Sequence, residues 1–432
     1  MEKSVVVIGS CFLGMMTGVT LASLGHHVTV LDTDTERIKR LKKGVMPFYE
    51  PGLEERVYEF MQKQCLHFED KKGLLLTQAD VIYVTTLHGL SQQNQVQETL
   101  EREAAYVSAY ANNNAIVMLK GSVPVGTTRQ FSRQLLQPLQ VGYESSFLTR
   151  GSALRDAFKG ERTVIGTTSN QIKYAIRCLY ETLDVPLFET TIETAELIQY
   201  VTHAFLATKI SLINELADIC EEVGVDIEHV SEGVGMDSRI GHSFLQAGLA
   251  HVGSRFFKDT HALKNILRSN LRDSSIIQAV LEVQEARPRK IFRAIQQLGP
   301  LHGKRIVLLG LAESANTDCM IDAPSITITE LLLQEGATVL GYDPIVSSAA
   351  KEMMPSAFQL AESIEEALYE ADLAVLMTDW VQIEQYPFEG YKTFMKTPLL
   401  FDARNVHDPE EASQSGIQYY SVGRKPAHVT SF

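Results

Sequence analysis

Short apolar runs recur along the first part of the chain, separated by longer stretches that mix apolar and polar residues. Each run is too short and too continuously apolar for a strand with one face in water, which is typical of a buried parallel sheet. The stretches between them are long enough for crossover helices. The pattern therefore predicts a doubly wound α/β domain over about residues 1–190. Its predicted strands are Val5–Ile8, Val28–Leu31, Val81–Thr85, Ala115–Leu119 and Thr163–Ile165.

A long helix is predicted next, because residues 194–223 contain neither Pro nor Gly. Apolar residues recur along this stretch at helical spacing, among them Leu197, Val201, Phe205 and Leu212. A helix of about 30 residues is about 45 Å long, which exceeds what one domain needs. Such a helix commonly joins domains or forms a subunit interface. Further helix is predicted over residues 262–297.

A second α/β unit begins near Gly303 and repeats the first in outline: strand, glycine turn, helix, strand, acidic residue. The sequence thus predicts two Rossmann-like, doubly wound parallel-sheet domains, residues 1–190 and 299–432, joined by a long central helical segment, residues 191–298. The strands expected in the second unit are Ile306–Leu309, Val339–Tyr342, Leu373–Met377 and Leu399–Phe401.

Composition excludes several classes of protein. The 432 residues carry a formal net charge of −14, which repels nucleic-acid backbones. The five cysteines form no C-x-x-C pair, so neither a zinc site nor a disulfide framework is indicated, and reduced thiols in a cytoplasmic protein are expected. Residues 4–25 are uncharged, but glycines interrupt them, so we interpret them as strand, turn and helix rather than as a signal peptide or membrane span.

The first strand leads into Gly9-Ser10-Cys11-Phe12-Leu13-Gly14, which departs at one position from the dinucleotide pattern G-x-G-x-x-G. The middle glycine, which lets the backbone approach a diphosphate, is Cys11. Cys11 is either a small residue that replaces glycine or a reactive thiol at a helix N-terminus. Asp32, at the end of the second strand, would accept hydrogen bonds from ribose hydroxyls and repel a 2′-phosphate. If a dinucleotide binds, these residues favour NAD over NADP.

Several further motifs appear in order along nearly the whole chain, and together they closely resemble the UDP-glucose/GDP-mannose 6-dehydrogenase family, in particular its UDP-glucose 6-dehydrogenases. The motifs are Phe48-Tyr49-Glu50-Pro51-Gly52-Leu53-Glu54-Glu55, Ser122-Val123-Pro124-Val125-Gly126-Thr127, Ala204-Phe205-Leu206-Ala207-Thr208-Lys209-Ile210-Ser211, Arg239-Ile240-Gly241, Gly310-Leu311-Ala312, Asn316-Thr317-Asp318 and Asp402-Ala403-Arg404-Asn405.

The resemblance implies an oxidation of a sugar C6 alcohol to a carboxylate with two NAD and no metal. In the family a lysine and a water-holding aspartate assist the first hydride transfer. A cysteine thiolate then traps the aldehyde, and a glutamate positions the water that releases the acid. It also implies a UDP-sugar ligand, a homodimer formed through the central helix, and a cytoplasmic enzyme with no nucleic-acid or membrane partner.

The same resemblance implies the residues of each site. The cofactor-binding residues would be Gly9, Cys11, Phe12, Leu13, Gly14, Asp32, Arg37 and Ser122. The substrate-binding residues would be Phe147, Leu148, Asn214, Arg239, Phe244, Gly253 and Arg404. No metal ligand is expected.

The catalytic positions depart from the family. Its Gly-Gly-Ser-Cys-Phe-Pro-Lys-Asp segment reads Val252 to Asp259, with Arg255 at the nucleophile. Its Asn-Pro-Glu-Phe-Leu-Arg-Glu-Gly segment reads Glu144 to Gly151, with Ser146 at the water-positioning glutamate. The lysine and asparagine of the central helix are Gln199 and His203, the Gly-Thr-Pro loop is Leu87-His88-Gly89, and a second-domain arginine is Ile321. Asp259 and Ser122 (for threonine) are what remain of the catalytic set.

Arginine is protonated at any working pH and cannot act as a nucleophile, so the four-electron reaction is predicted to be lost. A rescuing thiol would have to reach the site through folding, and Cys11 is the one cysteine in the cofactor turn. Arg255 would contact a phosphate or form a salt bridge with Asp259, four residues on. His203 would be a general base or a packing residue, and Lys209 is interpreted as structural, near the subunit interface.

Three functions stay open at this point. The first, which we favour, is a non-catalytic homologue that binds a nucleotide sugar or regulates an active paralogue by pairing with it. The second is a two-electron NAD-dependent oxidoreductase for an altered nucleotide sugar, with His203 or His251 as base. The third is a true UDP-glucose 6-dehydrogenase with a rearranged site.

Overall fold

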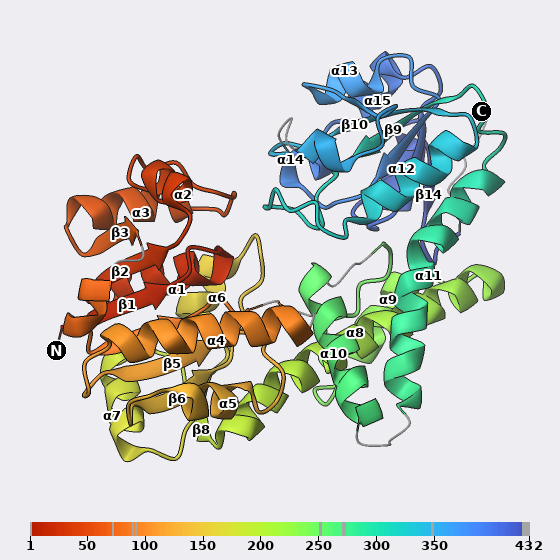
Figure 1. Cartoon of the computed structure of the whole chain (residues 1–432). Coiled ribbons are helices and arrows are strands. Elements are labelled where there is room, and N and C mark those ends of the chain that lie inside the picture. Colours follow the sequence, from red (N-terminus) through yellow and green to blue (C-terminus); the bar gives the residue numbers. More distant parts are fainter. Residues whose placement is uncertain are drawn as a thin grey trace. The chain divides into compact units, whose positions relative to one another are not determined.

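The computed structural model describes residues 2–70, 73–88, 90, 93–249, 253–269, 274–346 and 350–425. The chain divides into two compact units, residues 1–202 and 203–432, and the helix α8 (Ile192–Val223) continues from one into the other (Figure 1). The uninterrupted helix predicted over residues 194–223 is confirmed within two residues at its start.

The first unit is built on an eight-stranded sheet in the order β3-β2-β1-β4-β5-β6-β7-β8. The strands are β1 (Ser4–Ile8), β2 (His27–Asp32), β3 (Leu66–Asp70), β4 (Val81–Val84), β5 (Ile116–Lys120), β6 (Gln140–Glu144), β7 (Thr163–Gly166) and β8 (Leu187–Thr190). The helices are α1 (Phe12–Ser23), α2 (Thr35–Leu41), α3 (Leu53–Gln62), the 3₁₀ helix η1 (Gly73–Gln78), α4 (Gln93–Tyr110), α5 (Thr127–Gln134), α6 (Ala153–Lys159) and α7 (Asn170–Leu179).

Apolar side chains alternate between the two faces of this sheet, and helices cover both faces. Val5 and Val7 of β1 pack on the face covered by α1, α3 and α7, whereas Val6 and Ile8 pack on the face covered by α4 and α5. The doubly wound fold predicted from the apolar runs is therefore confirmed. The strand predicted at Thr163–Ile165 is present as β7, but its expected parallel direction is wrong at one edge. It pairs antiparallel with β6, with Tyr143 opposite Gly166, and parallel with β8.

The second unit contains a six-stranded parallel sheet in the order β11-β10-β9-β12-β13-β14. The strands are β9 (Arg305–Leu309), β10 (Thr338–Tyr342), β11 (Gln359–Leu360), β12 (Leu373–Leu376), β13 (Leu399–Asp402) and β14 (Gln418–Ser421). The helices are α9 (Ile227–Gly235), α10 (Gly253–Ser269), α11 (Ser275–Gln297), α12 (Pro324–Gln334), the 3₁₀ helix η2 (Ala350–Met353), α13 (Ile364–Leu368), α14 (Val381–Glu384), α15 (Phe388–Phe394) and α16 (Pro409–Gln414).

Its core also has two layers. Ile306 and Leu308 face a cluster built from α11, α12 and the second half of α8, and Val307 and Leu309 face α13, α15 and α16.

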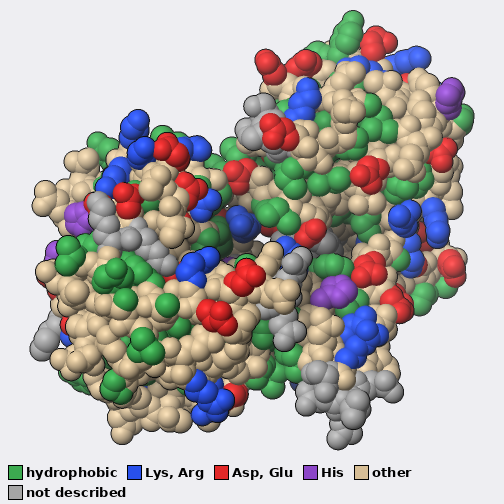
Figure 2. All heavy atoms as spheres, viewed as in Figure 1, with side chains coloured by type: hydrophobic (Ala, Val, Ile, Leu, Met, Phe, Trp, Pro, Cys, Tyr) green, Lys and Arg blue, Asp and Glu red, His purple; other side chains and the backbone are tan. Residues whose placement is uncertain are grey.

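On the face of the molecule that Figure 2 shows, basic side chains are interspersed with acidic ones. No helix in the described ranges is both long enough and apolar enough to cross a bilayer.

Candidate functional site

The turn between β1 and α1 has a backbone path that two of its glycines make possible. Gly9 has φ +107°, and a Cβ atom there would come within 2.8 Å of the Thr86 side chain. A Cβ on Gly14 would lie 1.8 Å from the Gly9 carbonyl oxygen, so α1 packs against β1 only with glycine at this position. These are the turn and close-packing roles that the dinucleotide pattern gives its first and last glycines.

Cys11 occupies the middle position without backbone strain, because its φ of −68° is open to any residue. It is the N-cap of α1, but its side chain makes no cap hydrogen bond. The thiol is directed instead at Thr85, 3.8 Å from the carbonyl oxygen and 3.7 Å from Oγ1. The first turn of α1 also contains no acidic residue. The positive end of this helix therefore suits an anionic group.

Asp32 closes the turn from the end of β2. Its Oδ2 accepts from the Ser10 amide at 2.8 Å and from Ser10 Oγ at 2.5 Å, and its Oδ1 accepts from the Asp34 amide at 3.0 Å. Arg37 Nη1 lies 3.8 Å from Oδ2. Burial raises the pKa of Asp32, but these hydrogen bonds and the Arg37 charge outweigh burial and hold the pKa below its usual value. Asp32 is thus a carboxylate at neutral pH.

These residues fit a dinucleotide. The Thr86 Oγ1 atom beside the turn is buried and makes no hydrogen bond to any described residue, so a polar ligand would satisfy it. The ionised Asp32 suits ribose hydroxyls, and the uncapped start of α1 suits a diphosphate. At the neighbouring strand end, the Ser122 amide donates to His88 Nδ1 at 3.0 Å, so a neutral His88 ring carries its proton on Nε2. Gly89 lies outside the described residues.

Gln199 and Ser146 are brought together in the first unit, although 53 residues separate them. Gln199 Oε1 accepts from the Ser146 amide at 2.6 Å, and Gln199 Nε2 donates to the Ser146 carbonyl oxygen at 2.5 Å. Both side chains are buried, and Ser146 Oγ is without a hydrogen-bond partner among the described residues. The next residue, Phe147, has the Arg162 guanidinium 4.5 Å from its ring centre, and Leu148 packs against the apolar core. Gln199 therefore holds the backbone of this loop.

His203 and Asp259 form the corresponding pair in the second unit. His203 Nδ1 lies 2.5 Å from Asp259 Oδ2, with the two side chains 3% and 6% exposed. The Phe256 ring packs edge-on against the imidazole at 4.3 Å. The carboxylate fixes the ring orientation and places a proton on Nδ1. The sequence analysis predicted a water or Arg255 as the partner of Asp259, whereas the partner that the structure shows is His203.

The segment that bears Arg255 is helical, as its salt-bridge interpretation required. Gly253 and Arg255 lie in the first turn of α10, but the structure does not describe their side chains. His251, the other candidate base, lies outside the described residues. The cysteines of this unit, Cys220 and Cys319, are buried, and burial raises the pKa of Cys220. That is the opposite of an activated nucleophile.

Three predicted substrate-binding residues meet around the loop 244–249 of the second unit. The Gly248 amide donates to Asn214 Oδ1 at 2.9 Å, and Gln246 Nε2 donates to the Arg404 carbonyl oxygen at 3.0 Å. Phe244, at the start of the loop, has φ +63° and its ring centre 6.3 Å from that of Phe256. Asn214 on α8 and Arg404 after β13 therefore both contact the loop that bears Phe244.

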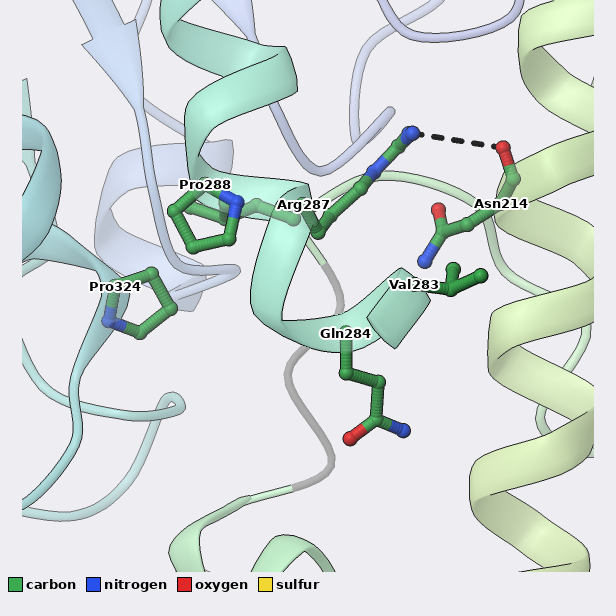
Figure 3. A pocket seen from close by; sticks show the side chains of 7 residues that line it. Asn214, Val283, Gln284, Arg287, Pro288 and Pro324 are labelled. Carbon is green, nitrogen blue, oxygen red and sulfur yellow. Dashed lines mark hydrogen bonds between the residues drawn. The ribbon is translucent and has the colours of Figure 1, made fainter. Parts of the chain in front are cut away.

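Asn214 also lines a small cavity of about 10 Å³ with Gln284, Arg287 and Pro288, and Arg287 Nη1 donates to the Asn214 carbonyl oxygen at 3.4 Å (Figure 3). This cavity has space for about one water molecule, not for a nucleotide.

Arg239 lies apart from the cluster around loop 244–249. Its side chain is 87% exposed and pairs with Asp237. Lys209 supports the same segment, because its Nζ donates to the carbonyl oxygens of Ile240 and Ser243. This agrees with the structural role predicted for Lys209. Arg404 Nη2 contacts Asp379 at 3.1 Å, and Ile321 is exposed.

A buried polar cluster in the first unit was missed by the sequence analysis. Glu144 accepts from Lys120 Nζ at 2.6 Å, from Tyr83 OH at 2.8 Å and from Tyr180 OH at 2.9 Å. Burial, followed by the charge of Glu144, raises the pKa of both tyrosines well above 10. The available signal was a charged residue at the end of each of two neighbouring strands, Lys120 on β5 and Glu144 on β6. Glu144 also ends the strand from which the Ser146 loop begins.

Groups of three or more side chains suited to a metal ion do not occur among the described residues. The first unit thus contains the dinucleotide turn and the Gln199–Ser146 pair, and the second unit contains the His203–Asp259 pair and the loop 244–249.

Comparisons with known proteins match models of one family along most of the chain. That family is the UDP-glucose/GDP-mannose dehydrogenase family. Its NAD-binding domain matches residues 3–184, its central domain matches residues 193–286 and its UDP-binding domain matches residues 307–409. The chain is 40% identical to UDP-glucose 6-dehydrogenase YwqF and 35% identical to UDP-glucose 6-dehydrogenase TuaD, both from Bacillus subtilis. The alignment with YwqF covers 98% of this chain and 98% of YwqF. The alignment with TuaD covers 99% of this chain and 95% of TuaD.

Among solved structures, the chain is similar to a UDP-glucose dehydrogenase from Pyrobaculum islandicum. The TM-score is 0.87 and the identity 28%, over 98% of each chain.

Proposed function

Since this chain belongs to the UDP-glucose/GDP-mannose dehydrogenase family, we propose that it is a nucleotide-sugar-binding member that does not complete the four-electron oxidation. The family gives it an NAD-binding domain and a UDP-binding domain. The proposal concerns what the chain does with these ligands. It separates binding, for which the residues are present, from the second oxidation step, for which they are not.

The observation that carries the proposal is the pairing of Gln199 with Ser146. The family's lysine and glutamate would stand at these two positions, and both would be ionisable. Here a neutral amide forms two hydrogen bonds to the backbone of a serine, in a place where both side chains are buried. Neither group can transfer a proton at neutral pH. Arg255, at the position of the nucleophile, cannot form a covalent intermediate with an aldehyde.

Residues that would hold NAD are present. Asp32 would accept from ribose hydroxyls, and the amide groups at the start of α1 would face the diphosphate. When bound, NAD supplies a hydride acceptor. The chain's own contribution would be to bind the cofactor and, in the second unit, to hold the nucleotide sugar near Asn214, Phe244 and Arg404.

A second candidate function is supported by the His203–Asp259 pair. A buried carboxylate that orients an imidazole is the arrangement of a general base. It would suit removal of a proton from an alcohol during a two-electron oxidation to an aldehyde, or the reverse reaction. A true UDP-glucose 6-dehydrogenase with a rearranged site is the third candidate, supported by the 40% identity to YwqF.

We also propose a homodimer formed through α8, or a pair with an active paralogue. Apolar side chains on one face of this helix are strongly exposed: Val201 by 46%, Phe205 by 69%, Leu212 by 55%, Ile219 by 52% and Val223 by 65%. Exposed apolar stripes of this length mark interaction surfaces. Sedimentation should show a dimer that Phe205→Glu converts to a folded monomer. A monomeric parent protein that also fails to pair with a paralogue would refute this proposal.

Titration calorimetry with NAD and, separately, with UDP-glucose tests ligand binding. Binding of both is expected and keeps the two-electron function open. Binding of the sugar nucleotide alone would indicate a sensor or regulatory subunit. If neither binds at millimolar concentration, the proposal is wrong and a purely structural role takes its place.

Restoring the family's residues at the four substituted catalytic positions tests whether these positions account for the lost activity. The combined variant Arg255→Cys, Gln199→Lys, His203→Asn and Ser146→Glu should form more NADH from UDP-glucose than the parent protein does. Arg155→Gln, an exposed change on α6, is the control. A combined variant that folds, binds both ligands and still matches the parent rate would count against these positions as the cause.

A further inference from the structure

Ser10 ties the dinucleotide turn to Asp32 with both of its hydrogen-bond donors. The Ser10 amide and the Ser10 hydroxyl donate to Asp32 Oδ2, at 2.8 and 2.5 Å. Ser10 is fully buried, and the amide of the preceding Gly9 donates to the Leu31 carbonyl oxygen at 2.8 Å. The turn and the end of β2 are therefore held together by three hydrogen bonds, two of which come from Ser10.

These hydrogen bonds determine which oxygen of Asp32 has capacity left for a ligand. A carboxylate oxygen accepts about two hydrogen bonds, so the two from Ser10 fill Oδ2. Oδ1 accepts one from the Asp34 amide at 3.0 Å, which leaves it one position for a further donor. Arg37 Nη1, 3.8 Å from Oδ2, is too far away for a hydrogen bond. The Asp32 side chain is 13% exposed, so a ribose hydroxyl can reach the carboxylate and bind at Oδ1.

The second unit contains the same kind of turn without this hydroxyl. The amides of residues 311–312 donate to Asp343 Oδ2 at 2.7 and 3.1 Å. The Trp380 indole donates to the same oxygen at 3.2 Å, and two further amides donate to Oδ1. Asp343 is also only 6% exposed. The hydrogen bonds of the fold thus occupy both oxygens of Asp343, whereas Ser10 fills one oxygen of Asp32 and leaves the other for a ligand.

We propose that Ser10 is a positioning residue for the cofactor, which acts through Asp32 to present Oδ1 to the hydroxyls of the adenosine ribose. The proposal rests on the NAD-binding domain of the family, not on whether the oxidation is completed. The Ser10 hydroxyl also stabilises the charged form of Asp32, because it donates to the carboxylate. The charge and its orientation together select NAD, since NADP has an anionic phosphate in place of one ribose hydroxyl.

Calorimetric titration of the full-length protein with NAD and with NADP tests the proposal. Ser10→Ala removes the hydroxyl and keeps the amide, so Asp32 loses one of the two hydrogen bonds that fix Oδ2. The variant should bind NAD about tenfold more weakly, which is the usual scale for a hydrogen bond to a charged group. Its affinity for NADP should not change, because Asp32 does not favour the 2′-phosphate. The ratio of NAD affinity to NADP affinity should therefore fall by the same factor.

A double-mutant cycle with Asp32→Asn shows whether Ser10 acts through Asp32. Asp32→Asn alone should weaken NAD binding, and Ser10→Ala added to it should change the affinity by less than about twofold. Ser23→Ala on α1 is the matched control, because the Ser23 hydroxyl donates to the Val19 carbonyl oxygen within its own helix. This control should bind both nucleotides as the parent does.

The proposal is overturned if Ser10→Ala binds NAD within about twofold of the parent affinity. It is also overturned if NAD and NADP lose affinity equally, or if the loss adds in full to that of Asp32→Asn, because either result would indicate a packing role alone. A parent protein that binds no NAD would overturn it as well. Absence of NADH formation from UDP-glucose would not bear on it, so this proposal and the proposed loss of the oxidation fail separately.

Discussion

Removal of the Glu144 carboxylate should destabilise the first unit strongly. Glu144 is 2% exposed and accepts from Lys120, Tyr83 and Tyr180, and Lys120 itself is 8% exposed. Glu144→Ala leaves that ammonium buried without its counter-charge, which costs about 3–5 kcal/mol in proteins. The two tyrosine hydroxyls lose their acceptor as well. We therefore expect a loss near the upper end, about 5 kcal/mol, against a total stability of about 5–15 kcal/mol.

Urea unfolding measures this loss, and the position of the single tryptophan separates the units. Trp380 is buried in the second unit, where its indole donates to Asp343 at 3.2 Å. Glu144→Ala should therefore shift the circular-dichroism transition of the first unit to lower urea and leave the Trp380 fluorescence transition in place. The matched control is Glu69→Ala on β3, whose partly exposed pair with Lys42 should contribute at most about 1 kcal/mol.

A double variant tests whether the loss of stability comes from an unpaired charge or from altered packing in the cluster. Lys120→Met combined with Glu144→Gln removes both charges and keeps an acceptor for the tyrosines, so it should be much less destabilised than Glu144→Ala. The reasoning is refuted if Glu144→Ala loses less than about 1 kcal/mol. It is also refuted if the double variant is as unstable as Glu144→Ala, because the loss would then not come from an unpaired charge.

Three further predictions concern the site itself. Gln199→Ala leaves the buried amide and carbonyl of Ser146 without these two hydrogen bonds, so urea unfolding should show a loss of about 2–4 kcal/mol; a loss below about 0.5 kcal/mol would contradict the assigned role. Asp32 has a lowered pKa in the folded protein, so the stability it contributes is present above its unfolded pKa of 3.8 and is lost as pH falls through the folded pKa. The difference in unfolding free energy between the parent and Asp32→Asn should therefore shrink as pH falls below 3.8. A difference that does not change with pH would refute the assignment. Lys209→Met should speed amide hydrogen exchange in residues 240–244, and unchanged exchange there would show that Lys209 does not hold the segment.

Much of the fold could be predicted from the sequence, because buried parallel strands are continuous apolar runs and α8 lacks helix breakers. The strands that were missed have mixed sequences, such as Gln140-Val141-Gly142-Tyr143-Glu144 in β6. Its terminal Glu144 is buried only because Lys120 and two tyrosines from other elements reach it. A reading of local hydrophobicity cannot detect such a strand. The antiparallel pairing of β7 with β6 is likewise a contact between strands that local hydrophobicity does not specify.

The sequence could name single candidate residues of the site but not the pairs that they form. The glycines and Asp32 belong to a local pattern, so their positions followed from spacing. The partners of Gln199 and His203 are 53 and 56 residues away, and nothing in their own segments specifies them. The placement of Arg150 against Phe12 and Phe48 likewise depends on three segments that are distant in the sequence. Its one sequence signal was an arginine at a position where the pattern has a glutamate.

The most direct test of the central claim is incubation of the purified protein with UDP-glucose and excess NAD, with NADH and sugar acid both quantified. Our account predicts that no UDP-glucuronate forms and that two NADH per sugar never accumulate. One NADH per sugar, with an aldehyde trapped by hydroxylamine, would support the two-electron function of His203. Two NADH per sugar, formed at about 1 per second or faster, would contradict the account and identify the chain as a complete dehydrogenase.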